Sequence, residues 1–168
     1  MSDKKYYAGI DVGFSGGISI IDNDSKIIET IPMPILKTKV KNKSKSEYDL
    51  KSIIKIFKKY EFRMVGLEIQ QAFKMQGVVS MFKIGRGFGL LEGIISALGI
   101  PYTLIKPKIW QSTMFMGLPK DDSKTLSILV AERIWPEHDF RNSERCTNIS
   151  DGLTDSSLMA EYIRREIV

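Results

Sequence analysis

The stretch "YYAGIDVGFSGGISIID" (residues 6–22) decides the fold, because it contains two β-rich apolar runs joined by a glycine turn. The alternation of side chains in a strand puts Tyr7, Gly9 and Asp11 on one face of the first run. A buried carboxylate without a partner is costly, so we expect Asp11 to lie at an exposed strand end or beside a cation. The glycines that follow keep the surface next to it open to a backbone or a ligand.

Outward from this stretch, the hydrophobic periodicity predicts an α/β fold. Three antiparallel strands are followed by parallel additions, which makes a mixed five-stranded sheet with helices on both faces. We expect one domain over residues 1–168, with a long basic loop at about 34–47. The expected strands are 5–11, 16–22, 26–33, 62–69 and 99–105, and the expected helices are 48–60, 75–98, 106–115, 123–135 and about 150 to the C-terminus.

Composition excludes several classes of protein. The chain has 43% hydrophobic and 27% charged residues, as an ordinary globular protein does, and no apolar run suited to a bilayer. A single cysteine, Cys146, forms no internal disulfide, and the lone His138 argues against a histidine metal centre. We therefore expect a cytoplasmic protein without a membrane segment.

Acidic residues interrupt apolar surroundings in three separated segments. Glu68 repeats the pattern of Asp11 in "RMVGLEIQQ", and "SDGLTDSSLMAEY" carries Asp151 and Asp155 four residues apart on nearly one side of a helix. Acids that converge from distant segments are what a magnesium site needs, and two such ions can clamp both oxygens of a phosphodiester. Each acid also has a structural interpretation: Asp11 in a turn, Glu68 paired with Arg63 or a lysine, Asp151 as a helix N-cap.

Taken together, "GIDVGFSGGISIID", "LEIQQAF" and "SDGLTDSSLMAEY" resemble the three acidic motifs of RuvC-like Holliday-junction resolvases, within the ribonuclease H-like superfamily. The chain looks most similar to the small members from bacteriophages. The resemblance implies a dimeric endonuclease for DNA recombination and repair that nicks four-way junctions in pairs. It also implies Mg²⁺ as the cofactor, two ions per site, with Mn²⁺ as a substitute, in a bacterial or phage-infected cell.

The resemblance assigns roles by position. Asp11, Glu68 and Asp155 match metal ligands, whereas the position three residues before the last acid is Gly152. The family usually carries an acid or a histidine at that position. Asp151 lies one residue further back, and helix geometry permits either spacing, so Asp151 is the fourth candidate catalytic and metal-binding residue beside Asp11, Glu68 and Asp155. The resemblance also gives two DNA-binding residues. Lys124 matches a basic residue that faces DNA in the family. Phe73 matches, two positions later than expected, an aromatic residue that follows the second acid and wedges against bases at the crossover.

The surplus positive charge is concentrated in one segment. Residues 37–60 hold nine lysines against two acids, although the whole chain carries only +5. Such a block suggests a polyanion partner, and an extended segment would point its alternate lysines one way along a phosphate backbone. A solvated loop without a role is the plain alternative. The alternate lysines are Lys37, Lys39, Lys41, Lys43 and Lys45.

Glycines at four-residue spacing mark one face of the helix at 75–98 as a surface that another helix can approach closely. Together with the resemblance, this predicts a homodimer through that helix. The predicted interface comprises Met81, Phe82, Gly85, Gly89 and Gly93.

Other functions stay open. "GIDVGFSGG" also resembles the first phosphate motif of actin- and Hsp70-like ATP-binding proteins, although no convincing second glycine-rich loop follows. A branched-DNA-binding protein without catalysis is a further alternative, as are related nucleases that act on other branched DNA or on RNA hybrids.

Overall fold

The computed structural model describes residues 6–40, 43–70 and 77–167. Its main sheet has the order β3-β2-β1-β6-β7, with β1–β2 and β2–β3 antiparallel and β1–β6 and β6–β7 parallel. The expected mixed five-stranded architecture is therefore confirmed. The strands are β1 (Tyr6–Asp11), β2 (Gly17–Ile21), β3 (Ile27–Pro32), β6 (Phe62–Glu68) and β7 (Tyr102–Ile105).

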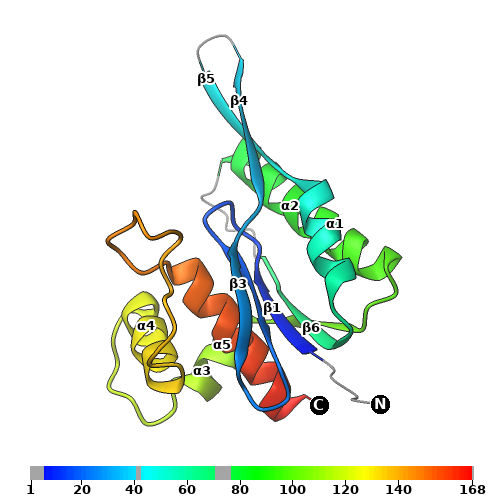
Figure 1. Cartoon of the computed structure of the whole chain (residues 1–168). Helices are drawn as coiled ribbons and strands as arrows, with labels where there is room; N and C mark the ends of the chain where they lie inside the picture. The colour runs from blue at the N-terminus through cyan, green and yellow to red at the C-terminus, as the bar shows by residue number, and fades with distance from the viewer. Residues whose placement is uncertain (1–5, 41–42, 71–76, 168) are drawn as a thin grey trace.

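Helices cover both faces of this sheet, as expected (Figure 1). One face carries α1 (Leu50–Lys59) and α2 (Val78–Ala97), whose buried Ile53, Phe57 and Leu91 pack on the apolar side of β1 and β6. The other face carries α5 (Asp151–Glu166), supported by α3 (Pro107–Met114) and α4 (Ser123–Ile134). None of the helices in these described ranges has the length and apolarity that crossing a bilayer requires.

The segment expected as a long loop is instead a β-hairpin, so that prediction is wrong. Strands β4 (Ile35–Val40) and β5 (Lys43–Tyr48) pair antiparallel and project from one end of the molecule (Figure 1). Directly opposed residues in an antiparallel pair share a face, and Lys45 opposes Thr38. Lys45 therefore lies on the face opposite to Lys37 and Lys39, and the lysines do not all point one way.

Close packing of α5 on the sheet depends on glycine. A methyl group at Gly9 would overlap the Ser156 carbonyl oxygen and come within 2.7 Å of the Ala160 nitrogen. Glycine thus lets the helix axis approach β1 closely, on the face that also carries Asp11.

Buried Glu161 stabilises the C-terminal end of α5. Its carboxylate accepts hydrogen bonds from Ser25 Oγ at 2.8 Å, Arg164 Nε at 2.8 Å and Arg165 Nε at 2.6 Å. Burial raises the pKa of Glu161, but these bonds more than offset it, and the pKa lies below its ordinary value. Glu161 is therefore ion-paired within α5, and its hydrogen bond from Ser25 joins α5 to the β2–β3 turn.

Candidate active site

Three of the predicted acids reach one edge of the sheet. Asp11 and Glu68 are the last residues of β1 and β6, and Ile10 pairs with Leu67 just before them. Because the two strands are parallel, both acids leave the sheet side by side. The first turns of α5 lie over the same end of the sheet (Figure 1). Asp155 lies in these turns, within reach of the charges of Asp11 and Glu68.

The acids influence one another electrostatically. Burial is the largest cause that raises the pKa of Asp11; the Gly13 N–H opposes the increase and the charge of Asp151 adds to it. Burial also raises the pKa of Glu68, a hydrogen bond from Trp110 lowers it, and the charge of Asp11 raises it further. Raised pKa values in a cluster of carboxylates are typical of functional sites.

Asp155 is the most perturbed member of the cluster. Burial, followed by the charges of Asp11, Glu68 and Asp151, raises its pKa from 3.8 to about 7. Ser127 lies near enough to lower that pKa in part, yet neither Ser127 Oγ nor Asp155 Oδ1 has a hydrogen-bond partner of acceptable geometry among the described residues. A buried carboxylate oxygen without a donor is a ready acceptor for a cation.

This raised pKa makes stability depend on pH. Between pH 3.8 and about 7 the folded protein keeps a proton on Asp155 that the unfolded chain has lost. Stability should therefore fall as pH rises through that window. In metal-free buffer we expect Asp155→Asn to raise the melting temperature at pH 8 by at least about 4 °C, and by much less near pH 5. Thermal unfolding from pH 5 to 8, with Asp24→Asn as the exposed control, measures this; a difference that is constant across pH would contradict it.

Trp110 orients Glu68. The indole is fully buried, and its Nε1 donates to Glu68 Oε1 at 2.9 Å, while Gln70 Nε2 lies 3.5 Å from Oε2. No ion pair joins Glu68 to Arg63 or to a lysine in the described residues, so that alternative is not supported. The sequence gives no signal for this contact, because a tryptophan on a short helix shows nothing of its hydrogen-bond partner.

Asp151 is ion-paired with a lysine, although its charge also acts on Asp11 and Asp155. Its Oδ2 pairs with Lys124 Nζ at 2.7 Å, and Ser150, not Asp151, is the N-cap of α5. At Gly152 a Cβ would overlap the Ser15 carbonyl and lie 2.6 Å from the Gly16 Cα. The position that the resemblance would give to a fourth ligand thus has no room for a side chain.

The donor set suits a hard divalent cation, but the side chains do not enclose one as they lie. Among the residues that the structure describes, no group of three acidic, histidine or cysteine side chains is tight enough to hold a metal ion. Two of the acids are engaged by other side chains, Glu68 by Trp110 and Asp151 by Lys124. The metal therefore stays a prediction, supported by the unpartnered Asp155 oxygen.

The remaining predicted residues lie elsewhere. Lys37, Lys39 and Lys45 are exposed on the hairpin, and Lys43 begins β5. Lys41 and Phe73 fall outside the described residues. On α2, Phe82, Gly85, Gly89 and Gly93 are exposed and Met81 is half-buried.

Comparison with known proteins shows the fold. No family model matches the sequence, and no curated protein matches it significantly. Among solved structures, the chain is similar to Thermus thermophilus RuvC in complex with a Holliday-junction substrate, with a TM-score of 0.57 and 12% identity over 96% of this chain and 95% of that one. It is also similar to a second T. thermophilus RuvC structure, with a TM-score of 0.56 and 14% identity over 95% of each chain. The yeast mitochondrial Holliday junction resolvase Ydc2 gives a TM-score of 0.49, with 15% identity over 94% of this chain and 77% of that one.

Proposed function

We propose that this protein is a magnesium-dependent endonuclease that resolves Holliday junctions, and related branched DNA, by paired nicks. The observation that carries the proposal is that Asp11, Glu68 and Asp155 lie near one edge of the sheet, where burial and their mutual charges raise their pKa values. The fold is shared with a RuvC solved on a Holliday junction, and the sequence motifs point to the same family. The localisation that suits this function is the cytoplasm of a bacterial or phage-infected cell.

The mechanism assigns a task to each side chain. Asp11, Glu68 and Asp155 would hold the metal, which when bound lowers the pKa of a water molecule and stabilises charge on the leaving oxygen. Trp110 fixes the direction of the Glu68 carboxylate through its 2.9 Å hydrogen bond. Lys124, exposed and paired with Asp151, would exchange that carboxylate for a phosphate oxygen of the DNA.

A panel of labelled DNA tests this function. Four-way junctions, flaps, duplexes and RNA–DNA hybrids are incubated with Mg²⁺ or Mn²⁺, with and without ATP. We expect symmetric nicks in the junction, dependence on the metal and no effect of ATP. Hydrolysis of ATP without cutting would favour the actin-like alternative, and absence of junction binding would overturn the proposal.

One observation favours a second candidate, a branched-DNA-binding protein without catalysis. The position of a possible fourth acid is filled by backbone at Gly152, and Asp151 is engaged by Lys124. Tight junction binding with no nicks in either metal would select this candidate.

The hairpin supplies a salt-sensitive DNA contact in this proposal. Replacing Lys37, Lys39 and Lys45 together by glutamine should weaken junction binding and reduce the slope of log K against log salt by about 0.9 for each phosphate that the variant no longer neutralises. Fluorescence anisotropy at several salt concentrations measures the slope. The matched control replaces the exposed Lys51, Lys55 and Lys58 of α1, which has the same change in charge. Equal slopes for the two triple variants would exclude the hairpin as the contact.

Paired nicks require two active sites, and α2 offers a surface for a second copy. Phe82 is 71% exposed, and nothing lies within 4 Å of where a Cβ would stand on Gly85, Gly89 or Gly93. Beside them runs an apolar hollow of about 310 Å³ that includes Ile54 and Leu90. Sedimentation at micromolar concentration should give a dimer, and Gly89→Arg a folded monomer. A monomeric wild type that retains paired nicking would contradict this.

A further inference from the structure

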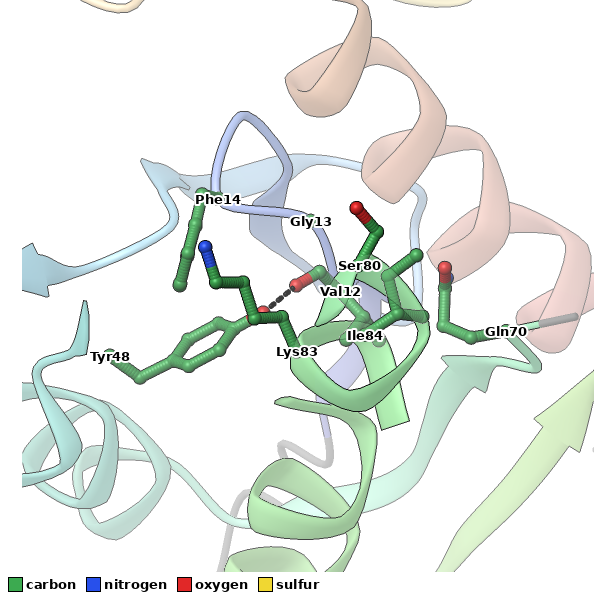
Figure 2. Close-up of a pocket in the computed structure, with 8 residues that line it drawn as sticks. All are labelled: Val12, Gly13, Phe14, Tyr48, Gln70, Ser80, Lys83 and Ile84. Atoms are coloured by element: carbon green, nitrogen blue, oxygen red, sulfur yellow. Dashed lines mark hydrogen bonds between the residues drawn. The ribbon is translucent and has the colours of Figure 1, made fainter. Parts of the chain in front are cut away.

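A pocket opens beside the carboxylate edge, on the face of the sheet opposite to α5 (Figure 2). Its floor follows Asp11 directly, because Val12 and Gly13 line it. At its other end lies Gln70, whose amide reaches toward Glu68. Burial is the main cause that raises the pKa of the Tyr48 phenol, and the negative charge of Asp11 raises it further. The pocket is therefore a direct neighbour of the proposed active site.

Two aromatic rings form one wall of this pocket. Phe14 and Tyr48 have ring centroids 4.7 Å apart, and the Tyr48 hydroxyl donates to the Val12 carbonyl at 2.7 Å (Figure 2). A Cβ at Gly87 would stand 2.7 Å from the Tyr48 ring, so only glycine lets that ring lie against α2. The wall is thus fixed before any ligand arrives, and 37% of Phe14 remains exposed.

Positively charged side chains line the route from this pocket toward the hairpin. A second hollow of about 450 Å³ shares Phe14, Tyr48 and Lys83 with the first, so the two form one groove toward the hairpin. Arg86 and Lys45 also line it, and the acid among its lining residues, Glu47, is paired with Lys45 at 2.7 Å. The groove therefore offers aromatic faces at one end and cations along its length.

Size and chemistry together indicate the ligand. The first pocket measures about 290 Å³, close to the lower limit of about 300 Å³ for ligand sites, and has room for one base. Aromatic faces beside a cationic track are how proteins hold single-stranded nucleic acid. We propose that the groove takes unpaired nucleotides next to the cut, with one base on Phe14 and Tyr48 and the adjoining phosphates on Lys83 and Arg86. This inference rests on the proposed function and specifies its substrate as a junction with an unstacked strand.

The test compares a fully paired junction with one that carries two unpaired nucleotides at the crossover, bound without divalent metal. Stacking of one base contributes about 1–3 kcal/mol, so wild type should prefer the unpaired form by about 5- to 150-fold. Phe14→Ala should lose this preference, and Phe14→Trp should keep it. Ile28→Ala, which removes an apolar side chain of matching exposure on β3, should also keep it. Circular dichroism confirms that each variant is folded.

A second readout does not depend on affinity. With 5-iodouracil at the unpaired position, irradiation should crosslink the base to Phe14 or Tyr48, as mapped by mass spectrometry. If wild type binds and cuts junctions but shows neither the preference nor this crosslink, or if Phe14→Ala behaves as wild type, the groove assignment is overturned and the nuclease stands. If wild type binds no junction, both the groove assignment and the proposed nuclease function are overturned.

Discussion

Asp11→Asn and Glu68→Gln should each reduce junction cleavage by about 10³-fold or more while leaving junction binding nearly unchanged. Metal-assisted stabilisation of the transition state amounts to several kcal/mol, and each 1.36 kcal/mol corresponds to tenfold in rate. Both substitutions keep the shape of the side chain and remove one negative charge from a crowded cluster. Folding should therefore not suffer, and single-turnover cleavage with Mg²⁺ gives the effect on chemistry.

Glu132→Gln is the matched control for these variants, because Glu132 is an exposed carboxylate on α4, away from the sheet edge. It should cut and bind as wild type does. A second measurement separates metal binding from chemistry. Mg²⁺ should raise the melting temperatures of wild type and of the control, and should raise that of Asp11→Asn much less. Near-normal cutting by Asp11→Asn would remove Asp11 from the site.

Gly9→Ala should destabilise the protein by about 3 kcal/mol or more, which for a chain of this size lowers the melting temperature by roughly 6–12 °C. The added methyl group would meet backbone atoms of Ser156 and Ala160, which cannot rotate away as a side-chain end can. Helix α5 must then move off β1, and Asp155 moves with it. Denaturant unfolding gives the free-energy change, and cleavage should fall in the fraction that remains folded.

Gly13→Ala provides the comparison. A Cβ there would have neighbours at 3.7–3.9 Å, which is ordinary contact, so the expected change is within about 0.5 kcal/mol. Equal stability of the two variants would show that α5 can adjust without cost, and the close approach at Gly9 would then not explain the glycine.

Much of the fold could be predicted from the sequence because its signals are local. Alternation in β1 placed Asp11 and Gly9 on one face, and α5 does pack on that face. The acids at 11, 68 and 155 were recognisable because each contradicts the polarity of its surroundings. What such a signal cannot give is the direction in which a carboxylate points: Glu68 is oriented by Trp110 and Asp151 by Lys124, both far away in the sequence.

The hairpin was missed for a different reason. Lysine is depleted in strands on average and serine is common in turns, so the composition of residues 34–47 predicted a loop. Strands with free edges, however, often carry lysine, whose charge prevents unwanted pairing with other chains. The alternation of Lys37 and Lys39 with Thr38 was a strand pattern, but a hairpin puts β5 back against β4 and distributes the lysines over two faces.

The contact between Gly152 and the backbone of the β1–β2 turn has a consequence for protein engineering. Because Ser15 and Gly16 lie against position 152, a larger side chain there cannot be introduced by that substitution alone; the turn itself would have to move first. Protein engineering at position 152 must therefore redesign the turn at the same time. The two segments, which lie near opposite ends of the chain, form one design unit.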